Sequence, residues 1–193
     1  HPTNIFYLTG LRGGGGESEF QLFFFPLDPD EPLSMVCRFA DVAEHRKMTL
    51  MDQVYGWGGR EPEDPMHVVN SIMKEKGYFN LRIGLEVPSY YLDPHHYIQL
   101  KDMLGDAMVT EATYFVENLR LVKTPAEIEC YREAASMAEI AMNTCVEHIA
   151  VGKTQQDVAA ELQYIMWQHG TEVPARPLYF GSGDRSAYTC WMP

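Results

Sequence analysis

The sequence predicts an α/β protein with two modules, of which the first is built around a mixed sheet and the second opens with two helices. Three observations favour this class. Aromatic and β-branched runs separated by Gly- and Pro-rich turns fill the first 40 residues, helical and strand patterns alternate after them, and two capped amphipathic helices follow from residue 124. At 193 residues, 46% of them hydrophobic, the chain is long enough for one full domain and part of another.

The first elements read as a three-stranded meander. Strands are expected at Ile5–Gly10, Glu19–Phe25 and Leu33–Phe39, with the loop Gly13–Gly16 after the first. The middle strand carries apolar side chains on both faces, with Phe20, Leu22 and Phe24 on one face and Phe23 and Phe25 on the other. We therefore expect helices to cover both sides of the sheet.

Helices and strands then alternate. Pro65–Lys76 reads as a helix ended by a glycine, and Leu81–Val87 reads as a strand. Asp93–Leu104 reads as a second helix, begun by Asp-Pro, and Ala107–Thr113 as another strand. The first module is therefore expected to end near residue 113.

The helix that begins the second module has a complete start signal. Thr124 can cap it, Pro125 takes the first helical position, and Glu127 stands three residues after the cap, which is a capping box. We expect its apolar stripe to pack against another element. The stripe consists of Ile128, Tyr131, Ala135, Ala138, Met142, Cys145 and Ile149.

A second capped helix follows the Gly152 break. Thr154 and Asp157 repeat the cap and the acid three residues later, and Gly170 can end the helix. Its apolar stripe consists of Val158, Leu162 and Ile165. Two amphipathic helices packed back to back are expected.

Charge and cysteine content narrow the function classes. The net charge of −12, with acidic excess in both halves, argues against a nucleic-acid partner. No apolar run reaches the roughly 18 residues of a membrane span.

The four cysteines are widely spaced and form no C-x-x-C pair, so they suggest neither a disulfide framework nor a zinc site. A protein of the reducing cytoplasm is therefore expected. Since the chain opens on His1 without an initiator Met, we expect an internal fragment of a longer protein.

Three segments carry recognisable motifs. His1–Gly10 matches an N-I-x-Y-L-T-G strand, Arg120–Ile128 matches an R-x-x-K-[ST]-x-x-E-[IL] junction, and Ile149–Val158 matches a link between two helices. In these motifs the chain resembles the creatinase, prolidase and aminopeptidase P superfamily, the pita-bread hydrolases. In that family the junction opens the catalytic domain, and the link joins the first two helices of that domain.

The resemblance covers nearly the whole chain. It implies a creatinase/prolidase-like N-terminal domain at residues 1–113, a junction at 114–123 and the first part of a pita-bread α+β catalytic domain at 124–193.

The same resemblance implies an activity for the full-length protein. The commonest one is metal-dependent hydrolysis of Xaa-Pro bonds in small peptides, by a cytoplasmic homodimer that holds two divalent ions (Mn, Co or Zn) on two Asp, one His and two Glu. These ligands would lie beyond Pro193, so that this fragment alone is expected to bind no metal and to be inactive. The alternatives are a creatinase-like, metal-free hydrolase of a C–N bond in a small zwitterion, and a non-catalytic relative.

The resemblance also directs attention to a few possible site residues. Cys190, followed by Trp191, stands where the family usually has a histidine after a Gly-rich turn, and it is either a nucleophile or an inert buried thiol. Asp184 and Arg185 in that turn could orient a zwitterionic substrate, or form an ordinary turn pair. Arg12 could contact a substrate carboxylate in a partner subunit's site, or be a solvated surface residue.

Other motifs favour structural readings. Gly152–Thr154 lacks the upstream glycine and strand of a phosphate-binding loop. The adjacent His95 and His96 point too far apart to share one metal ion, and they fit a helix surface. His148 and His169 fall near the ends of the two predicted helices, where an imidazole complements the helix dipole.

Overall fold

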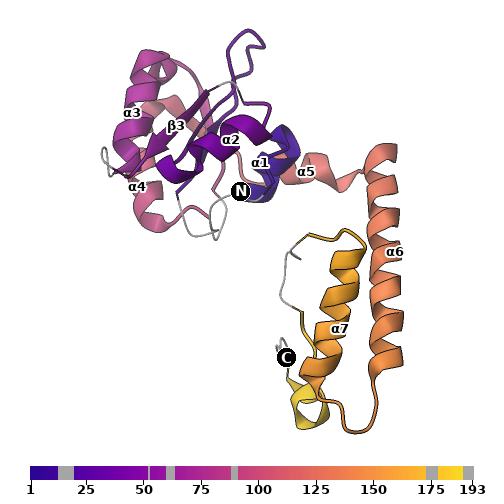
Figure 1. The fold of residues 1–193 in the computed structure, drawn as a ribbon. Helices are drawn as coiled ribbons and strands as arrows, with labels where there is room; N and C mark the ends of the chain where they lie inside the picture. Colours follow the sequence, from indigo (N-terminus) through magenta and orange to yellow (C-terminus); the bar gives the residue numbers. More distant parts are fainter. Residues whose placement is uncertain (13–19, 52, 60–63, 88–90, 173–177, 189–193) are drawn as a thin grey trace. The chain divides into compact units, whose positions relative to one another are not determined.

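The structure is a computed structural model, shown in Figure 1, and it describes residues 1–12, 20–51, 53–59, 64–87, 91–172 and 178–188. The chain divides into two compact units, His1–Leu121 and Val122–Pro193, which are described separately below. Among the described residues, no helix is both long and apolar enough to cross a membrane.

The first unit is built on a three-stranded mixed sheet. Its strands β1 (Leu22–Phe24), β2 (Ser34–Arg38) and β3 (Gln53–Trp57) lie in that order, with β2 in the centre. β1 pairs antiparallel with β2, while β3 pairs parallel with it. A parallel pair needs a crossover connection, which is formed here by the 3-10 turn η1 (Phe39–Asp41) and helix α2 (Val42–Met48).

The predicted mixed sheet is confirmed, but the predicted first strand is wrong. Residues Pro2–Thr9 form helix α1, and the third strand of the sheet is β3, which the sequence patterns did not suggest. Local signals favour the helix, because Pro2 occupies its first turn and Gly10 ends it with a left-handed φ of 77°. The Thr9 hydroxyl donates to the Ile5 carbonyl at 2.7 Å, which stabilises the last turn. Helical spacing also places Asn4, Ile5 and Thr9 on one buried face.

Helices cover both faces of the sheet, as the doubly apolar strand predicts. On one face, Val36 lies in a core with residues of α3 (Pro65–Glu75) and α4 (Pro94–Leu104), and Leu22 and Phe24 pack against it. On the opposite face, Met35 and Cys37 form a second core with residues that include Ile5 of α1, and Val42 of α2 packs against it (Figure 1).

The rest of the first unit follows the predicted alternation. Strand β4 (Ile83–Leu85) pairs parallel with β5 (Met108–Glu111) in a separate two-stranded sheet. The 3-10 turn η2 (Tyr78–Asn80) precedes β4, the 3-10 turn η3 (Gly105–Ala107) lies between the two strands, and helix α5 (Phe115–Leu121) follows them. The two predicted helices are confirmed as α3 and α4, and both are capped by an Asp that precedes a Pro.

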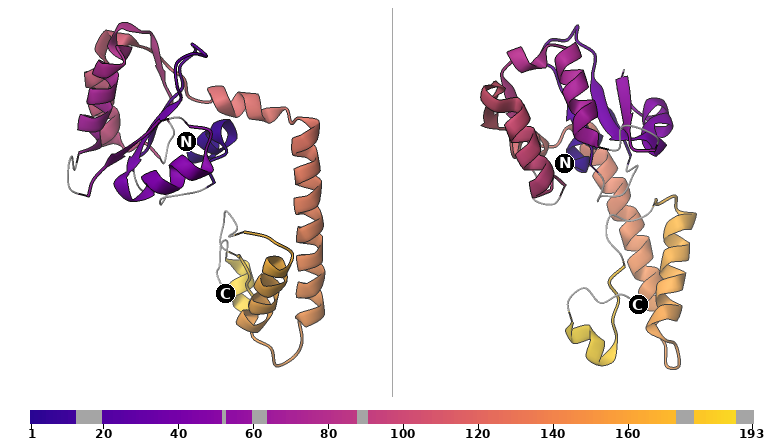
Figure 2. Two further views of the ribbon diagram at one scale, coloured as in Figure 1. Left: turned by 45° about the horizontal axis from the view of Figure 1, so that its top comes forward. Right: turned by 90° about the vertical axis from the view of Figure 1, so that its left-hand side faces the viewer.

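The second unit begins with the predicted helix pair. α6 (Pro125–His148) and α7 (Gln155–Gln168) run side by side, as the two views of Figure 2 show, and the 3-10 turn η4 (Gly183–Ala187) follows. Both predicted capping boxes are present, at Thr124 and at Thr154.

The predicted packing of the two helices is only partly confirmed. Val158 and Leu162 of α7 are buried against Ala141 and Cys145 of α6. Of the stripe predicted for α6, however, only Cys145 is buried, and the side chain of Met142 is 64% exposed. The reason is geometric, because the contacts of α7 concentrate on the C-terminal half of α6. An apolar stripe thus remains exposed on α6, and its large members are Ile128, Tyr131, Met142 and Ile149.

Removing the cap of α6 should destabilise the second unit. The Thr124 hydroxyl accepts a hydrogen bond from the Glu127 amide at 3.3 Å, and the Glu127 carboxylate accepts one from the Thr124 amide at 2.7 Å. We expect Thr124→Ala to lower the free energy of unfolding by about 1 kcal/mol, since it leaves an amide of the first turn without its partner. Urea unfolding followed by circular dichroism measures this. The control, Ser136→Ala at an exposed position of the same helix, should cost nothing; equal losses in both variants would contradict the capping role.

Candidate functional site

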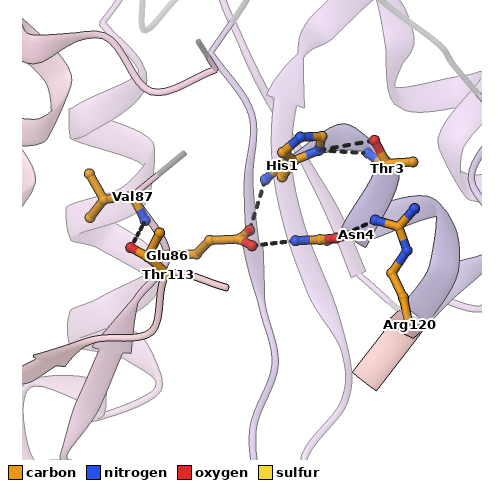
Figure 3. Close-up of polar contacts among 7 residues, drawn as sticks. All are labelled: His1, Thr3, Asn4, Glu86, Val87, Thr113 and Arg120. Atoms are coloured by element: carbon orange, nitrogen blue, oxygen red, sulfur yellow. Dashed lines mark hydrogen bonds and ion pairs between the residues drawn. The ribbon is translucent and has the colours of Figure 1, made fainter. Parts of the chain in front are cut away.

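A buried asparagine joins three separate elements of the first unit (Figure 3). Asn4 on α1 is 1% exposed. Its amide nitrogen donates to the carboxylate of Glu86, just after β4, and its carbonyl accepts from Arg120 Nη1 on α5 at 2.7 Å. The amino group of His1 lies 2.9 Å from the other Glu86 oxygen. The negative Glu86 and the positive Arg120 therefore flank the neutral Asn4 side chain, and each of the two polar atoms of that side chain has a hydrogen-bond partner.

The arginine of this network also makes a ring contact. The Arg120 guanidinium lies 5.9 Å from the centre of the Tyr7 ring, which belongs to the same helix as Asn4. Near it, the Val87 amide donates to the Thr113 hydroxyl at 3.2 Å, which ties the end of β4 to the segment before α5. The network fixes α5 against α1 and β4, and its groups all have partners, so its role is to position the chain rather than to react.

Motif analysis did not identify this network as a unit. Asn4 and Arg120 each belong to a motif that carried the family resemblance, and they stand 116 positions apart. The presence of Asn4 and Arg120 in those motifs was the only hint in the sequence that they matter, and Glu86 lies in none of the motifs. A single sequence contains nothing that pairs these three positions.

The predicted substrate residues lie in different parts of the chain. Arg12 is an exposed residue of the first unit, three positions after the end of α1. Asp184 and Arg185 are exposed neighbours in η4 of the second unit. Cys190 and Trp191 fall outside the described residues, as does the predicted loop Gly13–Gly16.

Short-range contacts shape the turn that carries Asp184 and Arg185. Glycine fits closely at position 181, because a Cβ there would lie 3.1 Å from the Arg185 carbonyl oxygen and the turn would have to shift to admit it. The Ser186 hydroxyl donates to the Gly183 carbonyl at 2.7 Å, and the Ser182 amide lies 3.4 Å from the Gln155 side-chain oxygen at the start of α7. The turn is therefore held against α7, with its adjacent acid and base facing solvent.

The histidines take the structural positions predicted for them. Nδ1 of His148 lies 2.8 Å from the Thr144 carbonyl, at the end of α6. Nδ1 of His169 lies 2.9 Å from the Ile165 carbonyl, at the end of α7. Both rings thus lie against carbonyls near the helix ends, and the Ile165 carbonyl also accepts from the backbone amide of His169. Within the described ranges, no three His, Cys, Asp or Glu side chains gather in a way that could hold a metal ion.

His95 and His96 also lie on a helix, in the first turn of α4. Both backbone amides donate to the Asp93 carboxylate, which caps the helix, and the His96 ring contacts the same carboxylate. Although burial opposes the change, hydrogen bonds from His96 and His95 lower the pKa of Asp93. The pair therefore serves the helix start.

A hollow of about 640 Å³ lies within the loop Phe25–Leu33. Its Glu31 carboxylate accepts hydrogen bonds from Lys76 Nζ at 2.6 Å and from the Tyr78 hydroxyl at 3.1 Å. The Lys76 hydrogen bond is the main reason that the pKa of Glu31 is lowered. These contacts tie the loop to the end of α3, and they bring no catalytic pair together.

Two family models match the chain in succession. The model described as Creatinase/Prolidase N-terminal domain matches residues 1–122, and the model described as Metallopeptidase family M24 matches residues 129–193. The boundary between the matches falls at the start of α6.

Individual relatives agree with these matches. The chain is 39% identical over 72 residues to an Xaa-Pro dipeptidase of Pyrococcus furiosus, covering 37% of this chain and 21% of that protein. It is 25% identical over 169 residues to the putative dipeptidase YkvY of Bacillus subtilis, covering 88% and 45%. Where matches run along most of the chain, it spans about half the length of the curated relatives.

The fold agrees as well. The crystal structure of the prolidase from Pyrococcus horikoshii superimposes with a TM-score of 0.67 at 21% identity, over 97% of this chain and 48% of that one. The first family model alone covers well over half of the sequence. On these grounds, the chain belongs to the creatinase/prolidase family, with an α/β N-terminal domain followed by the first part of an M24 metallopeptidase domain.

Proposed function

We propose that, in a protein of its relatives' length, this chain supplies the N-terminal domain and the first helices of a metal-dependent Xaa-Pro dipeptidase or aminopeptidase. The observation that carries the proposal is the succession of the two family matches, at residues 1–122 and 129–193. Relatives named Xaa-Pro dipeptidase support the choice of activity. We divide the chain into a domain at 1–113, a junction at 114–123 and the first part of the catalytic domain at 124–193.

The residues that the structure describes do not provide the ligands for the metal centre of such an enzyme. None of their His, Cys, Asp and Glu side chains form a group of three or more that could hold an ion. In this proposal, two divalent ions such as Mn, Co or Zn are bound by residues other than these. We therefore assign no chemical step to the described part of the chain.

The contribution of this chain to the site would be substrate binding. Arg185 and Asp184 are exposed on a turn held against α7, and their opposite charges suit the two ends of a zwitterionic dipeptide. Arg12 would contact a substrate carboxylate in the partner subunit of a homodimer. Trp191 completes the proposed substrate-binding set on the basis of sequence alone. Cys190, at the position of the family's histidine, is instead a candidate catalytic residue, also from sequence alone.

The decisive experiment compares the full-length protein with the 193-residue chain. We expect the full-length protein to contain about two divalent ions per subunit by plasma mass spectrometry and to cleave Ala-Pro. The isolated chain should bind no stoichiometric metal and cleave nothing. A full-length protein that holds its metal but leaves Xaa-Pro dipeptides intact would refute the proposed activity, and cleavage by the isolated chain would refute the placement of the metal centre.

A substitution tests the substrate-binding role. Arg185→Gln in the full-length protein should raise KM for Ala-Pro by about tenfold with little change in kcat, because it removes one charge-assisted hydrogen bond to the ground state. Arg132→Gln is the matched control, since Arg132 is an exposed residue of α6 that pairs with Glu129. Equal effects of the two variants on KM would remove Arg185 from the site.

A creatinase-like activity is the second candidate, favoured by Cys190 at the position of the family's histidine. It predicts cleavage of a C–N bond in creatine by a metal-free protein. Assaying creatine beside Ala-Pro separates the two functions. We further propose a cytoplasmic homodimer, which sedimentation of the full-length protein would test.

A further inference from the structure

One histidine of the first unit has a buried ring without a hydrogen bond. His45, in the middle of α2, is 0% exposed, and neither of its ring nitrogens has a partner. In contrast, the rings of His96, His148 and His169 each contact an oxygen atom. Since buried polar atoms in native proteins nearly always have partners, an orphaned imidazole in a core requires an explanation.

The helix that carries His45 covers an apolar core. α2 packs on β3 and contributes Val42 to the core that contains Met35, Cys37 and Val54. Arg46 Nη2 donates to the Val54 carbonyl at 3.0 Å, which holds the helix on β3. The Thr49 hydroxyl donates to the His45 carbonyl at 2.7 Å, which closes the last turn of α2.

The charged groups near His45 belong to α2, to the turn before it and to the end of β2. Asp41 precedes the helix and pairs with Arg38 of β2 at 3.5 Å. Glu44, Arg46 and Lys47 lie on α2. β3 offers only the phenol of Tyr55 as a titratable group, and Cys37 on β2 has a pKa raised to about 12, chiefly by burial. α1, whose Ile5 lies in the same core, carries no Asp, Glu, Lys or Arg.

Burial has the largest effect on the pKa of His45. Loss of solvation lowers the pKa of His45, although the negative charges of Asp41 and Glu44 act in the opposite direction. The neutral ring is therefore the form that fits the core, and a proton on the ring favours a conformation in which His45 reaches water. Stability of the closed state is fully present above the ordinary pKa of a solvated histidine and is lost as the pH falls below it.

We propose that His45 is a proton-operated latch, in which the neutral imidazole keeps α2 closed on the mixed sheet and protonation releases the helix as a local unit. α2 is suited to such motion, because it has only seven residues and no side-chain cap at its start. On release, the imidazolium can stay near Asp41 and Glu44 in water. Cys37, which is 0% exposed beneath the helix layer, becomes accessible at the same time.

The coupling between proton binding and the opening of α2 determines how strongly the opening equilibrium depends on pH. If only the open state binds the proton, with a pKa near 6.5, the opening equilibrium rises about tenfold between pH 7.5 and pH 5.5. The opening equilibrium of α3, on the other face of the sheet, should not show this change with pH.

Hydrogen exchange of the full chain, analysed by mass spectrometry, tests the latch. After correction for intrinsic exchange rates, peptides that cover α2 should lose about tenfold in protection between pH 7.5 and 5.5, while peptides of α3 keep theirs. Modification of Cys37 by 4,4′-dithiodipyridine should accelerate in parallel, relative to the exposed Cys130.

Variants separate the latch from general acid instability. His45→Gln and His45→Leu remove the titrating group, one polar and one apolar, and in either of them the protection of α2 should no longer depend on pH. His67→Gln, at an exposed position of α3, should leave the wild-type dependence intact. The proposal is overturned if α2 keeps its protection at pH 5.5, if every peptide loses protection equally, or if the folded His45 variants retain the wild-type dependence.

Discussion

Asn4→Leu should lower the free energy of unfolding of the first unit by about 3 kcal/mol. Leucine has a similar size, so the volume of the core is nearly conserved and the loss reports mainly on hydrogen bonds. The substitution leaves Glu86 without the amide that donates to it, and Arg120 without the carbonyl that accepts from it. Denaturant unfolding of the wild-type and variant chains measures the difference.

A matched control lies on α5. Asn118→Leu changes the same residue type at an exposed position of the same unit, and it should alter stability by less than about 0.5 kcal/mol. Similar losses in the two variants would mean that asparagine in general, and not this network, is the source of the effect.

A double-mutant cycle measures the interaction free energy between Asn4 and Arg120. Arg120→Met removes the cation that donates to Asn4, so the effects of Arg120→Met and Asn4→Leu should be strongly non-additive, with a coupling of at least about 1 kcal/mol. Additive losses would contradict a direct interaction between α1 and α5. Coupling across 116 residues would establish the network as the anchor that fixes the junction helix to the domain.

Cap chemistry explains which elements could be predicted from the sequence. α3, α4, α6 and α7 each start with a side chain that accepts from the first turn, and these signals are local. The doubly apolar run around Leu22–Phe24 likewise predicted a sheet covered on both faces, because alternation is also a local property.

The errors arise where two local signals compete or where the cause is distant. Ile5–Gly10 has the composition of a strand, but Pro2 and the left-handed Gly10 frame it as a helix. β3 is short, and it is defined by parallel pairing to β2 across an intervening helix, which no local pattern reveals. The stripe on α6 is periodic enough to predict, whereas the length over which α7 covers it is a tertiary property.

The candidate site shows the same division. The turn that carries Asp184 and Arg185 could be read from its glycines, but the partnership of Asn4 with Glu86 and Arg120 depends on the meeting of three elements. The orphaned ring of His45 is equally invisible in sequence, because burial by the surrounding core, and not residue type, makes it unusual.

Leu100→Ala should cost the first unit about 3 to 4 kcal/mol, the largest loss expected of any single truncation considered for this chain. Leu100 on α4 is 1% exposed and lies in the core with Val36 and Val69, where the helix layer meets the sheet. Truncation removes apolar contacts and leaves a cavity that rigid neighbours fill only in part. Urea unfolding of the variant gives the value.

Two further variants of α4 decide what that loss means. Ile98 is 57% exposed on the same helix, so Ile98→Ala should cost less than about 1 kcal/mol, since it removes no packed volume. Leu100→Met keeps most of the volume and should cost less than about 1.5 kcal/mol. If Ile98→Ala proved as damaging as Leu100→Ala, the face of α4 that packs on the sheet would be assigned wrongly; if Leu100→Met matched the alanine variant, shape rather than volume would control the core. The expected ranking of the three variants follows from α4 presenting Leu100 to the sheet and Ile98 to solvent.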